Sequence, residues 1–152
     1  MNLSSYPDST NLAASLLKLF LRSLETPIFP PAIYSLVQSC PPASTPIPAI
    51  DHIRTALLPA LSPLSLHVLS SVITVVREVK DHSAVNLMDT SNLVICLTPC
   101  LCDGGGVSQV ELMRIAGWQI PGGKRVESGS GTVANLLRIL IDQSVALCAS
   151  PF

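Results

Sequence analysis

The chain has 152 residues and a net charge of −1, with 48% of its residues hydrophobic and only 12% charged. So little charge excludes the concentrated basic face that nucleic-acid binding needs, and no apolar stretch reaches the roughly 18 residues of a membrane span. The N-terminus MNLSSYPDST lacks the basic segment and apolar core of a secretory signal. The five cysteines show no disulfide-framework spacing, which indicates free thiols and a reducing, cytoplasmic location.

The first predicted helix covers about 11–24, with Ser9 and Thr10 as suitable caps. Its polar residues fall on one stripe at helical spacing, and nearly everything between them is apolar, so we expect a helix that is buried on most sides. Lys18 and Arg22 lie four residues apart in this stripe. Both cations therefore project from one face and favour an anion opposite them. The stripe comprises Asn11, Ser15, Lys18, Arg22 and Glu25.

Prolines organise the next part of the chain. Those within 27–31 end the first helix and precede a short one. The inward positions of that short helix are Ile33, Leu36 and Val37. The segment 40–48, CPPASTPIP, has four prolines and is expected to be an extended loop. Asp51 is expected to cap a further short helix that ends before Pro59.

Two later helices have recognisable starts. Ser62 followed by Pro63 is a cap with a first-turn proline, and it opens a long helix to about residue 81. The β-branched run 72–76 could be a strand if taken alone, but the length and the capped start favour a helix. Asp89 is expected to cap the next helix, and Pro99 is expected to stop it.

Glycine dominates the stretch before the last helix. Gly104–Gly106 is expected to be a flexible break, and Ser108 with Glu111 forms a capping box for a short helix to about residue 116. The glycine-rich segment 120–131 is typical of a mobile loop. The last helix is expected to start at Thr132.

Two segments carry a more specific pattern. Ser15–Pro30 reads SLLKLFLRSLETPIFP, and Asn86–Leu101 reads NLMDTSNLVICLTPCL. In this order they resemble the RhoGAP domain, the all-helical module that activates Rho-family small GTPases and whose helices carry LLKxxLRxLPxPL and NxMxxxNLAxVFxPxL. The segment 58–76 resembles a further helix of that family, and GTVANLLRILIDQSVALC resembles its closing helix.

The resemblance implies an all-α, RhoGAP-like multi-helix domain over 9–149, after a disordered segment at 1–8. It implies a GTPase activator and not an enzyme, because the partner GTPase itself hydrolyses GTP, and it implies neither a cofactor nor a metal. Lys18 and Arg22 would face the GTP-bound GTPase near its switch regions. Asn92 would hydrogen-bond at the same contact.

One departure from the family concerns catalysis. The family's catalytic arginine precedes the Lys-Arg helix, and Met1–Leu17 contains no arginine. We therefore expect a domain that is incomplete at its N-terminus and does not accelerate hydrolysis, and we assign no catalytic residue. The apolar sides of 12–24 and 68–79 would then lack packing partners, which predicts exposed apolar faces and self-association.

Plainer alternatives compete with this interpretation. Lys18 and Arg22 could belong to a solvated stripe in which Glu25 pairs with Arg22, and the Asn92 amide could bond locally near a helix start. A helical scaffold without a GTPase partner is compatible with the same helices. So is a module that lacks the catalytic arginine and binds a GTPase without activating it.

Other chemistries have little support in the sequence. Cys96, Cys100 and Cys102 lack a CxxC spacing and a second cluster that could complete a metal site. The glycines in 121–125 do not form a phosphate loop, because Trp118 stands where that loop needs its first glycine. No local nucleophile signature indicates a hydrolase triad.

Overall fold

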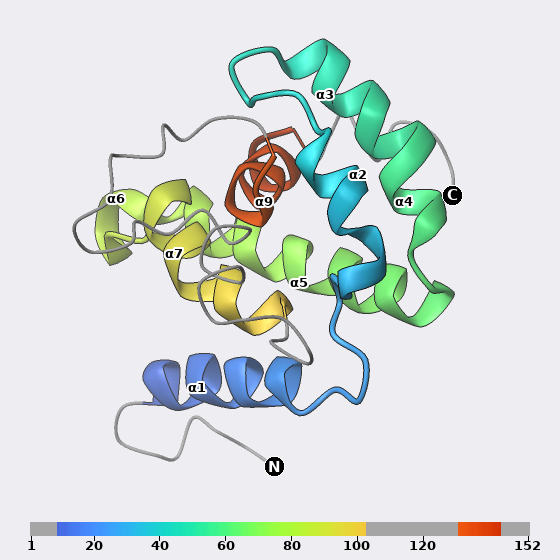
Figure 1. Cartoon of the computed structure of the whole chain (residues 1–152). Helices are drawn as coiled ribbons and strands as arrows, with labels where there is room; N and C mark the ends of the chain where they lie inside the picture. Colours follow the sequence, from blue (N-terminus) through green and yellow to red (C-terminus); the bar gives the residue numbers. More distant parts are fainter. Residues whose placement is uncertain (1–8, 103–130, 144–152) are drawn as a thin grey trace, which may run out of the picture.

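The computed structural model describes residues 9–102 and 131–143, and no strand forms within them. The helices are α1 (Ser9–Arg22), α2 (Tyr34–Gln38), α3 (Pro46–His52), α4 (Leu58–Ala60), α5 (Pro63–Asp81), α6 (Ser83–Asn86), α7 (Thr90–Leu101) and α9 (Val133–Asp142), with a 3-10 turn η2 (Pro31–Ile33) and a π-helical turn η3 (Ile53–Leu57). Figure 1 shows α9 near the centre, with α2 to α4 on one side of it and α1 at the edge. The predicted all-α class is confirmed. Within these residues, no helix combines the length and the apolar character needed to cross a bilayer.

Several predicted features lie outside the described residues. They are the disordered segment 1–8, the break at Gly104–Gly106, the capping box of Ser108 and Glu111, and the loop 120–131 up to its final glycine.

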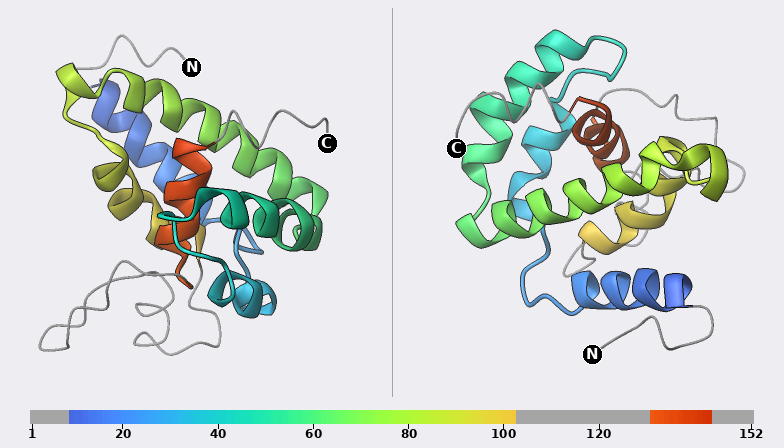
Figure 2. Two further views of the ribbon diagram at one scale, coloured as in Figure 1. Left: turned by 90° about the horizontal axis from the view of Figure 1, so that it is seen from above. Right: turned by 180° about the vertical axis from the view of Figure 1, so that it is seen from behind.

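Helix α1 is a peripheral element that lies alongside α7 (Figures 1 and 2). It begins earlier than the sequence predicts, so Ser9 and Thr10 lie inside the helix and are not its caps. Among residues 10–22 of this helix, only Leu21 is fully buried in the core. Its large exposed apolar residues are Leu16, Leu19 and Phe20. The predicted burial on most sides is therefore wrong, because α1 contacts the other described helices along one face only.

The proline-rich middle of the chain is more helical than the sequence predicts. Pro46 begins α3, so the loop is shorter than the predicted segment 40–48, and Asp51 lies inside the helix and does not cap it. Helix α3 continues through the π turn η3 into α4. Pro59 explains the widened turn, because it has no N–H to donate to the preceding turn of an α-helix.

The caps predicted for the two following helices are confirmed. Ser62 Oγ accepts a bond of 3.0 Å from the backbone N–H three residues on and starts α5, and Asp89 Oδ1 accepts one of 2.8 Å from the Asn92 N–H and starts α7. The β-branched run within α5 is helical, as predicted. Pro99 does not stop α7. A proline near the end of a helix removes a single backbone bond, and here it does so on the side where Ile95 is exposed.

Helix α9 supplies the most deeply buried face of the core. Its buried apolar residues are Val133, Leu136, Leu137, Ile139, Leu140 and Ile141. Thr132 Oγ1 accepts a 3.1 Å bond from the Asn135 N–H, which confirms the predicted start of this helix. The buried Asn135 side chain also accepts from the Ala43 N–H at 2.9 Å and donates to the Pro41 carbonyl at 3.1 Å. These bonds fix the proline loop against α9.

Candidate functional site

Lys18 and Arg22 lie one turn apart on α1, where Arg22 is exposed and Lys18 is half-buried. The buried Leu21 anchors the same turn to the core. Neither cation forms an ion pair with a residue that the structure describes, so the alternative pairing of Arg22 with Glu25 does not occur there. The two positive charges therefore have no anionic partner within the described part of the chain.

The helix dipole of α1 stabilises the charge of Arg22 more than that of Lys18. Arg22 is the last residue of the helix, where a cation interacts favourably with the negative end of the helix dipole by about 0.3–1 kcal/mol. Lys18 lies a turn earlier and gains less from the dipole. Two like charges at this spacing also repel one another by a few tenths of a kcal/mol. An anion beside both side chains would remove that repulsion.

The end of α1 is held in place, so Arg22 projects from a fixed backbone. The Ser23 N–H donates to the Leu19 carbonyl at 3.0 Å, and the Ser23 hydroxyl donates to the Phe20 carbonyl at 2.8 Å. A few residues on, the Phe29 N–H donates to the carbonyl of Leu101 at 2.9 Å. This bond ties the segment after α1 to the end of α7.

Asn92 lies in the first turn of α7 and is exposed. Its Nδ2 donates to the Leu87 carbonyl at 2.8 Å, so the local bonding that the sequence left open does occur. Its Oδ1 accepts no hydrogen bond from the described residues. The amide therefore fixes the loop before α7 and keeps one acceptor that a partner could use.

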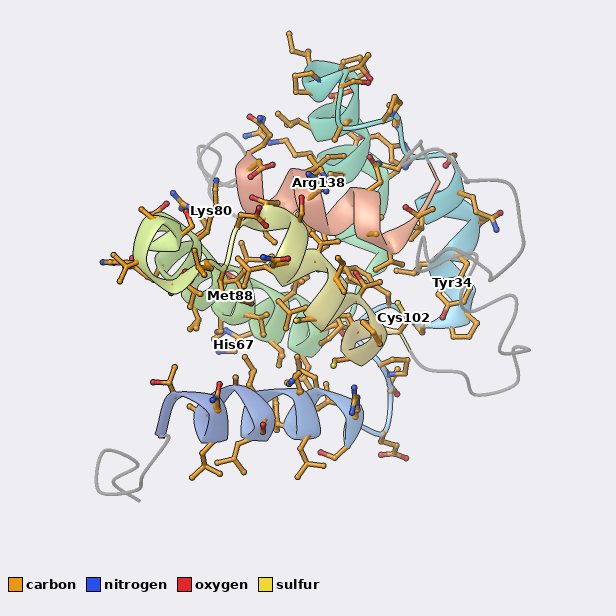
Figure 3. All side chains as sticks on the ribbon, turned by 90° about the vertical axis from the view of Figure 1, so that its left-hand side faces the viewer. Tyr34, His67, Lys80, Met88, Cys102 and Arg138 are labelled. Carbon is orange, nitrogen blue, oxygen red and sulfur yellow. The ribbon has the colours of Figure 1, made fainter. Side chains whose placement is uncertain are left out.

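The structure brings Lys18 and Arg22 together, while Asn92 lies further away along α7. Figures 1 and 3 show α1 closest to the C-terminal half of α7, whereas Asn92 belongs to the first turn of that helix. A docking surface that contains all three residues would extend along the α1–α7 pair.

A polar cluster secures the start of α7 against α5 and α9. Lys80 Nζ lies 3.1 Å from Asp142 Oδ1, and the Thr90 hydroxyl donates to the same oxygen at 2.8 Å. Arg138 Nη2 donates to the Ser91 hydroxyl at 3.3 Å. Figure 3 shows Lys80 and Arg138 near this end of α7. Both cations have partners within the described residues, which distinguishes them from Lys18 and Arg22.

The described cysteines act as core or surface thiols. Burial raises the pKa of the Cys40 thiol to about 11, and burial together with the neighbouring Cys100 raises that of Cys102 to about 12. Both thiols are therefore protonated and unreactive at neutral pH. Cys96 is exposed. Within 9–102 and 131–143, no three metal-binding side chains gather.

Sequence reasoning missed one residue beside this site. Leu87 has a φ of +59°, and no other residue but glycine has a positive φ in the described part of the chain. A leucine is unfavourable in that region of backbone space, so residue type gave no signal. The only hint was its place between Asn86 and Asn92 of the family pattern.

Comparison with known protein families gives one match. The model of the RhoGAP domain matches residues 4–104, a range that includes Lys18, Arg22 and Asn92. No solved structure matches the chain significantly.

Several curated proteins are similar to part of the chain. Human Rho GTPase-activating protein 4 is 32% identical over 88 residues, which cover 58% of this chain and 9% of that protein. Human SLIT-ROBO Rho GTPase-activating protein 1 is 34% identical over 91 residues, or 60% of this chain and 8% of that protein. SLIT-ROBO Rho GTPase-activating protein 2 of Danio rerio is 32% identical over 88 residues, which cover 58% of this chain and 8% of that protein. The chain thus spans less than a tenth of the length of these relatives.

Proposed function

Because this chain belongs to the RhoGAP domain family, we propose that it binds the GTP-bound form of a Rho-family small GTPase through Lys18, Arg22 and Asn92. The single observation that carries this proposal is the pair of cations on α1 without an anionic partner among the described residues. The names of the curated relatives, all Rho GTPase-activating proteins, support the class of partner.

The physical basis of the docking is charge complementarity. Two cations on a fixed helix attract an acidic surface and orient it during encounter, which favours association and the correct register. Asn92 adds a neutral acceptor at the other end of the surface. Such a surface binds the partner and leaves the chemistry of GTP hydrolysis to the GTPase, so the chain is a regulator and not an enzyme.

Acceleration of GTP hydrolysis needs a catalytic group that binding of the GTPase does not need. An arginine that reaches the transferring phosphate stabilises the charge of the transition state, and such a group increases the rate by roughly a thousandfold or more. Met1–Leu17, which precedes Lys18, contains no arginine. We infer that the chain as it stands binds the GTPase in the cytoplasm without accelerating it.

The docking surface is tested by charge reversal. Lys18→Glu with Arg22→Glu should abolish binding to a GTP-loaded Rho-family GTPase, as measured by calorimetry, while the helical circular dichroism stays unchanged. Lys124→Glu with Arg125→Glu changes the net charge equally and serves as the matched control, which should retain binding. Equal affinity of the wild type and the Lys18/Arg22 variant would refute the assignment.

A further inference from the structure

The end of α6 and the loop that joins it to α7 present apolar side chains to solvent. Val85, on α6, is 87% exposed, and Leu87, in the loop, is 75% exposed. The next residue, Met88, is half-buried and packs against the core, and Figure 3 shows it beside the start of α7. Met88 thus anchors the loop, while Leu87 contributes nothing to the core.

The backbone of Leu87 is in an unfavourable conformation. Its φ of +59° and ψ of +18° lie in the left-handed region, which glycine and asparagine tolerate and leucine does not. A bulky residue persists there only where its surroundings hold it, and such residues cluster at binding and catalytic sites. The exposed Leu87 side chain makes no core contact that would offset this strain.

Hydrogen bonds of Asn86, of Asn92 and of the Leu87 backbone hold the loop in this conformation. Asn92 Nδ2 donates to the Leu87 carbonyl at 2.8 Å, and the Leu87 N–H donates to the Ser83 carbonyl at 2.9 Å. Asn86 Oδ1 accepts from the Met88 N–H at 2.8 Å, and Asn86 Nδ2 donates to the carbonyl of Val79 at 2.7 Å. Bonds on both sides of Leu87 therefore fix where its side chain projects.

We propose that Leu87 is an apolar contact for the GTP-bound small GTPase, and that Asn86 and Asn92 are positioning residues that present it. This inference rests on the proposed function, because Asn92 belongs to the same docking surface and bonds directly to Leu87. The partner must then carry an apolar depression near the site that meets Asn92, at the other end of the interface from the acidic surface that receives Lys18 and Arg22. Burial of one leucine in such a depression accounts for an affinity gain of about tenfold to a hundredfold.

Two variants distinguish a contact between Leu87 and the GTPase from a role of Leu87 in the stability of the fold. Leu87→Gly and Leu87→Asn both suit a positive φ, so each should leave the unfolding midpoint unchanged or raise it. Each should weaken binding to the GTP-loaded GTPase by about tenfold or more in calorimetry. Val75→Ser removes another exposed apolar side chain, on α5, and should leave the affinity unchanged. A merely structural role would make stability and affinity change together.

A double-mutant cycle tests the positioning role. Asn92→Ala should weaken binding more in the wild-type background than in the Leu87→Gly background, because the asparagine acts partly through Leu87 and partly through its own Oδ1. Additive losses would overturn that role.

Three other outcomes would also overturn the proposal. If Leu87→Gly binds as the wild type does while the Lys18/Arg22 variant does not, the proposed function stands and the Leu87 contact falls. If Leu87→Gly changes the sedimentation of the chain alone and leaves GTPase affinity intact, the loop contacts a second copy instead. If the wild type binds no GTPase, both proposals fail together.

Discussion

Gly131 lies at the point where the chain enters α9, and its backbone leaves room for no side chain. Its φ is +91°, and a Cβ there would lie 2.8 Å from the backbone oxygen of Gln38. We expect Gly131→Ala to lower the free energy of unfolding by about 1–3 kcal/mol, because the new methyl group adds backbone strain to a clash with main-chain atoms. Urea denaturation measures this change. Ser70→Ala, at an exposed position on α5, is the control, and an equal effect of both variants would contradict the reason given.

The buried thiols predict how stability depends on alkaline pH. The pKa of Cys40 is raised from 9.0 to about 11, and that of Cys102 from 9.0 to about 12, mainly by burial. Between pH 9 and the raised pKa of each thiol, the folded chain keeps a thiol proton that the unfolded chain has released. The stabilisation is therefore complete below pH 9 and is lost as pH rises towards 11 or 12, by at most about 1.4 kcal/mol per pH unit for each thiol.

Thermal unfolding between pH 8 and pH 10.5 measures this dependence. Cys40→Ala with Cys102→Ala should flatten the fall in unfolding temperature above pH 9, even though the variant starts from a lower value. Cys96→Ala, at an exposed position, should keep the wild-type slope. A double variant that retains the full slope would show that other groups cause the alkaline loss.

At the scale of elements, α1 presents three large apolar side chains to solvent. Leu19 is 63% exposed and Phe20 is 48% exposed, and Leu16 lies beside them at helical spacing. Exposed apolar residues that gather in this way favour self-association. We expect the triple change to Gln at positions 16, 19 and 20 to reduce hydrophobic-dye fluorescence and to shift the chain towards a monomer in sedimentation. Unchanged dye binding would mean that this face of α1 is not the surface responsible.

The starts of α5, α7 and α9 were predictable because a cap is a local interaction. The hydroxyls of Ser62 and Thr132 and the carboxylate of Asp89 each bond a backbone N–H three residues away, so the residue type alone indicates the structure. Pro59 and Pro99 were misjudged as helix ends. Whether a helix bends, widens or stops at a proline depends on what the neighbouring carbonyls contact, and a linear pattern does not contain that information.

The candidate site was predictable in part for the same reason. The spacing of Lys18 and Arg22 places them on one face of any helix, whereas the positive φ of Leu87 depends on bonds from Asn86 and Asn92 that only the folded loop shows. The exposed apolar side chains of α1 were expected from the family resemblance alone, because an apolar sequence indicates a tendency to be buried and not what is available to cover it.

At the scale of the whole molecule, the proposed docking surface predicts binding of the GTPase without acceleration of hydrolysis. We expect single-turnover GTP hydrolysis by a panel of Rho-family GTPases to stay at the intrinsic rate when the chain is added, because Met1–Leu17 contains no arginine that could reach the phosphate. An acceleration approaching a hundredfold would show that another residue supplies that group.

The most direct test of the central claim is the affinity of the wild-type chain for a Rho-family GTPase in its two nucleotide states. A panel of these GTPases, each loaded with a non-hydrolysable GTP analogue or with GDP, is titrated with the chain in a calorimeter. We predict saturable binding to the GTP-like form of at least one GTPase and much weaker binding to its GDP form, because the surface that includes Lys18 and Arg22 is proposed to face the switch regions. No binding to any GTP-like form, or equal affinity for both forms, would contradict the proposed function.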